Sequence, residues 1–177
     1  MQNIGAYGTE IKDTFVRCKV LNLETLEVEE FDHEKCNFGY RESIFKREGT
    51  GKYVILEVTF KLTRKEHLIK TEYGAIQSEL ANLGIENPTI QEVSKAVINI
   101  RQSKLPDPKV LGNAGSFFKN PTIALSQFEE LKEKFSTIPG YPNGDFVKVP
   151  AGWLIEQCGW KGKQIGNVAS HELQSLV

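Results

Sequence analysis

Apolar and polar side chains alternate most regularly over residues 53–62, "YVILEVTFKL". A period of two residues is typical of a strand whose two faces meet different surroundings. The alternation predicts a strand with one apolar face, formed by Val54, Leu56, Val58, Phe60 and Leu62. Residues 14–31 carry valine and phenylalanine on both sides of a turn near residues 22–25, which predicts two further strands.

A period of 3.6 residues predicts the strongest helix, which follows Thr89. Thr89 and Glu92 have the spacing of a capping box, in which each residue bonds the backbone of the other. Pro106 and Pro108 end the pattern, because proline removes a backbone donor and clashes with the preceding turn. The apolar stripe of this helix comprises Ile90, Val93, Val97 and Ile100.

Shorter patterns predict three more helices. One covers residues 73–83 and is ended by Gly84, and another covers the start of "AGWLIEQCGW" near residue 151. A third is expected to begin at Ser126, with Glu129 completing a capping box. The inward face of this third helix is predicted to be Phe128, Leu131 and Phe135.

The segments between these elements are predicted to be irregular. Residues 32–49 are expected to form a short helical turn from Asp32 and then a loop, and residues 136–146 a turn-rich loop. Strands and helices do not alternate regularly, which predicts the α+β class. The proline pair is the best candidate boundary, so we divide the chain into residues 1–105 and 106–177.

Composition and charge narrow the class of protein. The 177 residues are 40% hydrophobic and 25% charged, as in a globular chain. The net charge is −1, so no basic field attracts nucleic acid. The three cysteines form no CxxC or Cys/His cluster, which argues against a metal site and fits a reducing compartment. No apolar run is long enough to span a membrane, and no secretory signal is visible, so we expect a cytoplasmic protein.

A serine and an arginine are the candidate reactive groups. Ser116 lies in "GNAGSFFKNP" without a GxSxG elbow, and no histidine suggests a triad, so a structural turn serine is the competing interpretation. Arg41 follows Tyr40 in "FGYRESIFK", and its planar fork suits a carboxylate or phosphate. A surface ion pair with Glu42 or Glu48 is the alternative for Arg41.

The stretch "QNIGAYG" places two glycines beside backbone amides, which allows a planar cofactor or a pyrophosphate to approach the main chain. It matches no phosphate-binding motif such as GxGxxG, so alone it is a weak signal. Three more polar residues lie beside other motifs, namely Lys104, Asn120 and Lys148. Taken singly, each is interpreted as a solvated surface residue.

Four motifs in this order resemble one family. "QNIGAYG", "FGYRESIFK", "SKLPDPKVLGNAGSFFKNP" and "PAGWLIEQCGWKGKQIG" are similar to the flavoenzyme family of UDP-N-acetylenolpyruvoylglucosamine reductases, over nearly the whole chain. The intervening "KTEYGAI" resembles the substrate-capping loop of the longer, type I subgroup.

The resemblance implies a three-part α+β flavoprotein that uses FAD as cofactor and NADPH as reductant. Residues 1–105 would be the remainder of the FAD-binding half, with its antiparallel strands, and residues 106–177 the α+β substrate-binding domain. The implied reaction reduces UDP-N-acetylenolpyruvoylglucosamine to UDP-N-acetylmuramate for peptidoglycan synthesis, so the implied partner is a UDP-sugar.

Site residues follow from the same resemblance. Ser116 occupies the position of the proton donor, and Arg41 that of the group that neutralises the substrate carboxylate. The positions that match substrate-binding residues are Tyr40, Tyr73, Lys104, Asn120, Lys148 and Gln164. The positions that match flavin-contacting residues are Asn3, Ile4, Gly5 and Tyr7, with Gly115 leaving room for flavin and substrate.

The family's upstream glycine-rich flavin loop and its C-terminal catalytic carboxylate have no counterpart in this sequence. We therefore expect a truncated piece that binds FAD weakly or not at all and is inactive alone. A non-catalytic UDP-sugar-binding module is the alternative, and a flavin-dependent oxidase a more remote one. The full-length protein is expected to be a monomer, whereas unpaired strand edges would favour dimerisation of the piece.

Overall fold

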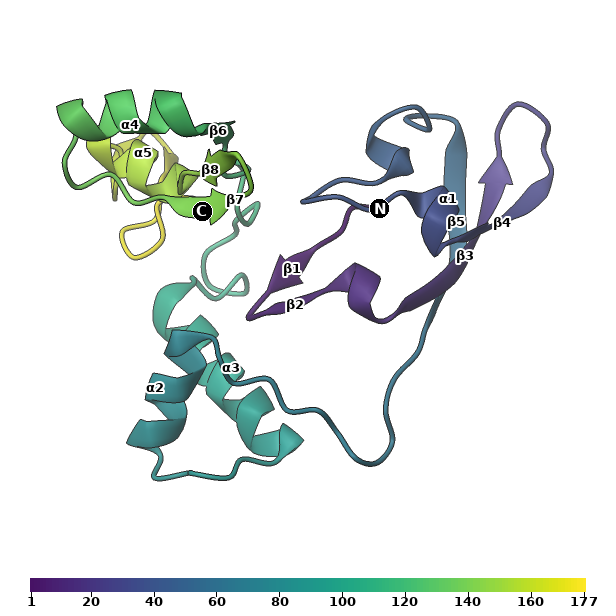
Figure 1. Cartoon of the computed structure of the whole chain (residues 1–177), viewed down its shortest axis with the longest axis horizontal. Coiled ribbons are helices and arrows are strands. Elements are labelled where there is room, and N and C mark those ends of the chain that lie inside the picture. The colour runs from purple at the N-terminus through teal and green to yellow at the C-terminus, as the bar shows by residue number, and fades with distance from the viewer. The chain divides into compact units, whose positions relative to one another are not determined.

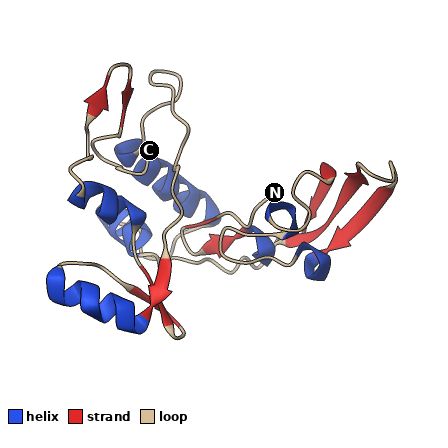
Figure 2. Cartoon of the chain, turned by 90° about the horizontal axis from the view of Figure 1, so that it is seen from above, coloured by secondary structure: helices blue, strands red, loops and turns tan.

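The structure, a computed structural model, describes all 177 residues. The chain divides into two compact units, Met1–Asn99 and Ile100–Val177, which are described separately. Figure 1 colours the first unit from purple to teal and the second from teal to yellow. Both units combine helices with antiparallel strands, so the predicted α+β class is confirmed (Figure 2).

The first unit is built on a three-stranded antiparallel sheet in the order β4-β3-β5. The predicted hairpin is confirmed as β3 (Phe15–Asn22) and β4 (Val28–Asp32), and the predicted third strand is β5 (Tyr53–Phe60). The first strand of the hairpin is central because β5 pairs with its free edge. The sheet therefore pairs residues of β3 and β5 that are 31 (Asn22 and Tyr53) to 45 (Phe15 and Phe60) positions apart in the sequence.

The predicted apolar face of β5 is wrong. Leu56 forms a β-bulge, since Lys19 pairs with Glu57 while the next residue, Val20, pairs with Ile55. A bulge inserts one residue and so reverses which face the following side chains occupy. Val54 therefore lies on the face opposite to Val58 and Phe60, and Leu62 lies beyond the end of the strand.

The core of this unit lies on one face of the sheet. Its buried members are Phe15, Cys18, Val20, Phe31 and Cys36. The last of these ends α1 (His33–Cys36), which Asp32 caps by accepting a hydrogen bond from the backbone N–H of Lys35, as expected for a helical turn there. The two cysteine sulfurs are 4.0 Å apart, and burial raises the pKa of both thiols, to about 12 for Cys36. Both cysteines are therefore neutral, unreactive core groups at neutral pH.

Smaller elements surround this sheet. The N-terminal hairpin consists of β1 (Gly5–Ala6) and β2 (Thr9–Glu10), followed by the 3₁₀ turn η1 (Ile11–Asp13). A second 3₁₀ turn, η2 (Ile44–Lys46), lies within the loop that was predicted to be irregular.

Two helices complete the first unit, although the second of them continues past its boundary. The helix α2 (Gly74–Asn82) confirms the prediction at residues 73–83, and it buries Ile76 and Leu80. Gly84 follows with φ +69°, a left-handed conformation that glycine adopts without steric cost. The helix α3 (Ile90–Lys104) ends immediately before the predicted proline stop.

The capping box of α3 forms as predicted. The Thr89 hydroxyl accepts a hydrogen bond from the Glu92 backbone N–H at 3.3 Å, and the Glu92 carboxylate accepts from the Thr89 backbone N–H at 2.6 Å. Those bonds, first the one from the Thr89 backbone, lower the pKa of Glu92. The carboxylate therefore stays ionised and keeps the helix start closed at neutral pH.

We expect Thr89→Ala to destabilise the chain by about 1 kcal/mol, because the first turn of α3 loses its side-chain acceptor. The matched control is Ser94→Ala, which removes an exposed hydroxyl from the interior of the same helix. Chemical denaturation followed by far-ultraviolet circular dichroism measures both. Equal midpoints for the two variants would contradict the assigned cap.

The second unit is built on short strands in the order β6-β8-β7, with two helices. Its buried residues include Ile138, Val147, Val149 and Ala151. In chain order its elements are β6 (Thr122–Ala124), α4 (Leu125–Lys134), β7 (Tyr141–Asn143), β8 (Phe146–Lys148), α5 (Ala151–Gln157), β9 (Gln164–Ile165) and β10 (Val168–Ala169).

Two local predictions in this unit are wrong. The turn-rich loop contains β7 and the start of β8, which reverse direction at Gly144 with φ +61°. The third helix starts one residue early, since β6 runs directly into α4 and Ala124 is the N-cap. Ser126 therefore lies inside the first turn, and its capping box with Glu129 is absent. The helix near residue 151 is confirmed as α5.

Candidate functional site

In the first unit, the "QNIGAYG" segment lies against the "FGYRESIFK" loop. The Asn3 side chain is fully buried between them. Its Nδ2 donates to the Gly39 carbonyl and to the Glu10 carboxylate, each at 3.1 Å, and its Oδ1 accepts from the backbone N–H of Lys12 at 3.1 Å. Both polar atoms of the amide are therefore bonded within the protein.

The Arg41 guanidinium lies against the backbone of the same segment. Its Nη1 donates to the Asn3 carbonyl at 3.4 Å, and its Nη2 donates to the Gly5 carbonyl. The guanidinium carbon lies 5.6 Å from the centre of the Tyr40 ring. Since a guanidinium carries five N–H groups, these two bonds fix its direction and leave further donors for an anion. Of the two alternative ion-pair partners for Arg41, Glu48 instead lies 3.6 Å from the Arg47 side chain.

Two further side chains of the loop hold the segment in place. The Ser43 hydroxyl, fully buried, donates to the Met1 carbonyl. The Lys46 ammonium donates to the Gln2 side-chain oxygen at 2.9 Å and to the Arg41 carbonyl at 3.0 Å. Sequence reasoning missed both, although each stands inside the motif that identified Arg41. Arg41 itself has φ +55°, a conformation that non-glycine residues rarely adopt.

Gly5 packs closely against the side chains of Glu10 and Arg41. The β1–β2 pairing sets it opposite Glu10. A Cβ atom at this position would lie 2.7 Å from Glu10 Cγ and 3.3 Å from Arg41 Nη1. Glycine is therefore needed for the close approach of the hairpin to the guanidinium, and not for a left-handed backbone.

The Glu10 carboxylate, which sequence reasoning also missed, is ionised. Burial raises its pKa, but hydrogen bonds from Lys12 and Asn3 lower it by more, so the pKa lies below its ordinary value. The Lys12 ammonium lies 3.0 Å from the carboxylate. Only the β1–β2 turn brings Glu10 to Asn3, so no motif in the linear sequence indicates the contact.

Two predicted tyrosines of the first unit meet. The rings of Tyr7 and Tyr73 pack edge to face with centroids 5.3 Å apart, and Tyr73 is the N-cap of α2 and half exposed. Ile4, the remaining predicted flavin contact, has an exposed apolar side chain. The structure therefore gathers Asn3, Gly5, Tyr40 and Arg41 at one place and pairs Tyr7 with Tyr73.

In the second unit, Ser116 is exposed on a short irregular segment. Gly115 before it has φ +68° with open space where a side chain would lie, and its N–H bonds the Asn113 side chain at 3.1 Å. The N–H of Phe117 after it donates to the Leu176 carbonyl at 3.1 Å. The serine is thus held on both sides by backbone bonds while its hydroxyl faces outward.

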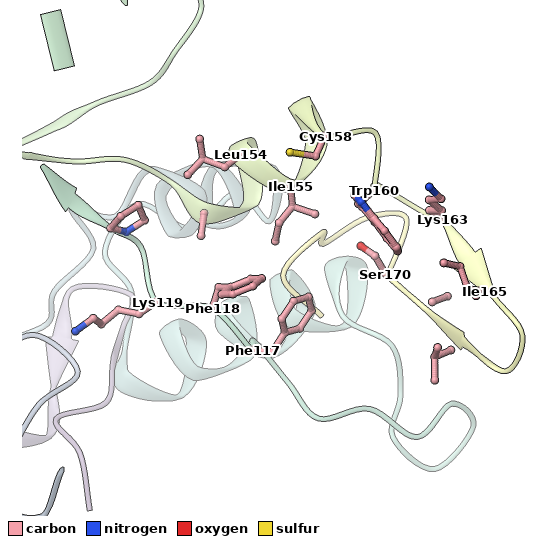
Figure 3. A pocket seen from close by; sticks show the side chains of 14 residues that line it. Phe117, Phe118, Lys119, Leu154, Ile155, Cys158, Trp160, Lys163, Ile165 and Ser170 are labelled. Carbon is pink, nitrogen blue, oxygen red and sulfur yellow. The ribbon is translucent and has the colours of Figure 1, made fainter. Parts of the chain in front are cut away.

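An apolar cavity of about 800 Å³ adjoins this segment. Figure 3 shows the Phe117 and Phe118 rings on the side of the cavity that faces α5. Trp160 and Ile165 line the end of the cavity to the right in that view. Both phenylalanines line this cavity and stay partly open to solvent, with 55% and 59% of their surface exposed.

The structure places the other predicted residues of the second unit on several different elements. Asn120 Oδ1 accepts from the Ala151 N–H at 2.9 Å, at the start of α5. Gln164 Nε2 bonds the Gly166 carbonyl at 2.9 Å, and Lys104 ends α3 with an exposed side chain. Lys148 ends β8. Their roles, and a meeting of Ser116 with Arg41, stay predictions.

No three His, Cys, Asp or Glu side chains come together as a group that could hold a metal ion. None of the helices combines the length and the apolar character that crossing a bilayer requires.

A family model matches most of the second unit. Residues 107–177 match the family model described as UDP-N-acetylenolpyruvoylglucosamine reductase, C-terminal domain. The fold of the chain resembles the crystal structure of UDP-N-acetylenolpyruvylglucosamine reductase from Thermus caldophilus, with a TM-score of 0.54 and 18% identity. That alignment covers 99% of this chain and 45% of the other. At this identity the likeness concerns the fold alone.

Full-length sequence relatives give the same name. The chain is 57% identical to a UDP-N-acetylenolpyruvoylglucosamine reductase of Flavobacterium johnsoniae, over all of this chain and 53% of the relative. It is 52% identical to one of Pseudomonas syringae pv. tomato, over all of this chain and 52% of that relative. The chain belongs to the UDP-N-acetylenolpyruvoylglucosamine reductase family, as its motifs indicated, and spans about half the length of these curated relatives.

Proposed function

We propose that this chain is part of a cytoplasmic oxidoreductase that reduces UDP-N-acetylenolpyruvoylglucosamine to UDP-N-acetylmuramate, with FAD as cofactor and NADPH as reductant. The observation that carries the proposal is 57% identity, across the whole chain, to a relative named for this reduction. The product would serve the synthesis of peptidoglycan, and with it the shape and division of the cell.

Arg41 would bind the carboxylate of the enolpyruvyl group. Two guanidinium N–H groups are already bonded to backbone carbonyls, so the remaining donors are oriented before substrate arrives. Negative charge on the substrate grows next to this carboxylate as the double bond is reduced. A fixed cation stabilises that charge without rearranging during the step.

Ser116 would supply the proton. Hydride addition at the enolpyruvyl carbon farther from the carboxylate leaves enolate character at the nearer carbon, which takes a proton from the serine hydroxyl. A hydroxyl is a weak acid, and a neighbouring cation would lower the barrier for this transfer. The exposed serine and the open space at Gly115 are compatible with such an approach.

Part of the first unit fits one side of a flavin. The exposed Ile4 side chain offers an apolar contact, and the open, left-handed backbone at Gly8 leaves room for a flat ring. When bound, FAD would carry electrons from NADPH to the substrate as hydride. Ile4, Gly5, Tyr7 and Gly115 would lie nearest to it, and Asn3, whose side chain is fully buried, would hold the flavin-contacting stretch in place.

The remaining residues would hold the UDP-sugar. Tyr73, half exposed at the start of α2, would close over the diphosphate as the capping tyrosine of a type I enzyme. The other proposed substrate-binding residues are Tyr40, Lys104, Asn120, Lys148 and Gln164.

The test is an assay of a full-length protein that carries this sequence. We expect flavin absorbance after purification and NADPH oxidation that depends on the enolpyruvyl substrate, with UDP-N-acetylmuramate identified by mass spectrometry. NADPH oxidation without that product would overturn the proposal. The 177-residue chain alone is expected to bind little FAD and to show no turnover, and calorimetry with the UDP-sugar tells whether it is a binding module.

A further inference from the structure

The contact between the "QNIGAYG" segment and the "FGYRESIFK" loop has a buried polar centre. Successive residues of the segment bond the loop, since the Met1 carbonyl, the Gln2 side chain and the Asn3 amide meet Ser43, Lys46 and Gly39 in turn. Of these side chains, Asn3 is at the centre and fully buried. The two backbone carbonyls that orient Arg41 belong to this same segment.

Glu10 sets the orientation of the Asn3 amide. An ionised carboxylate only accepts hydrogen bonds, so it requires the NH₂ end of the amide to face it, and Oδ1 is then turned to the Lys12 N–H. The lowered pKa of Glu10 keeps the carboxylate in this accepting form. With Nδ2 so placed, Asn3 also donates to Gly39, two residues before Arg41.

Glu10 and Arg41 also pack against the same glycine. A Cβ atom built at Gly5 would lie 2.7 Å from Glu10 Cγ and 3.3 Å from Arg41 Nη1. Gly5 pairs with Glu10 across the β1–β2 hairpin, and its carbonyl is the acceptor for Arg41 Nη2, so the hairpin connects Glu10 to the guanidinium. The hairpin position and the guanidinium direction are mechanically linked.

We propose that Asn3 and Glu10 are positioning residues for Arg41. Their hydrogen bond holds the segment carbonyls at the places from which Arg41 is aimed, and neither side chain needs to touch substrate. The inference rests on the proposed function for its kinetic consequence, whereas the orientation of Arg41 can be measured without any reaction.

The most informative variant is Asn3→Asp, which keeps the shape of the side chain but replaces the NH₂ donor with an oxygen. That oxygen would face the Glu10 carboxylate and the Gly39 carbonyl, both of which are acceptors. Glu10→Gln added to it restores a donor across the pair. In a full-length protein we expect Asn3→Asp to lower kcat about 10- to 100-fold, as for a misplaced catalytic group, with a smaller change in KM. The double variant is expected to regain part of the loss. The control is Glu57→Gln, an exposed carboxylate that pairs with Lys19 at 3.0 Å in the same unit.

The second measurement is the side-chain Nε–Hε resonance of Arg41 by NMR in the 177-residue chain. We expect a dispersed signal that collapses to the averaged position in Asn3→Asp and returns in the double variant. If Asn3→Asp fails to fold, Glu10→Gln alone is compared with Glu57→Gln. An unchanged Arg41 signal, or kinetics equal to the control, would overturn the positioning role. Absent turnover in the unmodified full-length protein would instead count against the proposed function and leave the NMR result decisive for this inference.

Discussion

Replacing Ser116 with alanine is expected to lower turnover of the full-length enzyme about 100- to 10,000-fold, the range for loss of a general acid. Reduction of the flavin by NADPH should proceed at its normal rate, because that step requires no proton from this serine. Stopped-flow absorbance separates the two half-reactions.

The structure indicates that this substitution removes the hydroxyl without disturbing the fold. The Ser116 side chain is exposed, and the bonds that hold its segment are made by the backbone of Gly115 and Phe117. Alanine therefore removes the hydroxyl without creating a cavity or an unpaired buried group. The melting temperature is expected to stay unchanged.

Ser126→Ala is the matched control, since it removes another exposed hydroxyl from the same unit. Equal oxidation of reduced flavin by substrate in both variants would show that Ser116 is a turn residue, the competing interpretation. A loss of flavin reduction in Ser116→Ala would also contradict the assigned role, because the defect would then precede protonation.

Features fixed by neighbouring residues were predictable from the sequence. The Thr89–Glu92 box forms because both partners lie in one helical turn. The same motif at Ser126 and Glu129 forms no capping box, because β6 leads directly into α4 and the helix already begins at Leu125. A four-residue motif carries no information about where the preceding strand ends.

Features fixed by pairing between distant segments were not predictable. The sequence of β5 does alternate, but the register of β5 with β3 creates the bulge at Leu56. The bulge places the apolar side chains before and after it on opposite faces of the sheet. Likewise, family resemblance indicated Arg41, whereas Glu10 becomes visible only once the hairpin reverses at Tyr7 and Gly8, both with positive φ. Sequence reasoning missed Glu10 for this reason.

Replacing Arg41 with alanine is expected to lower kcat of the full-length enzyme about 100- to 1,000-fold, the range for removing a preorganised group that stabilises a developing anion. KM should rise as well, because the carboxylate loses its partner in the ground state. Arg41→Lys should recover little activity, since an ammonium is a point charge that cannot make two parallel bonds while also reaching the Asn3 and Gly5 carbonyls.

Arg17→Ala is the control for the loss of one positive charge, because Arg17 lies on β3 and pairs with Glu30 at the surface. Added guanidinium salts distinguish a chemical role of Arg41 from a structural one. They should restore part of the turnover in Arg41→Ala, where they can enter the vacated place beside Tyr40, and none in Arg41→Lys. Activity of Arg41→Ala equal to that of Arg17→Ala would mean that the guanidinium serves only to fasten the hairpin, and the substrate carboxylate would then need another partner.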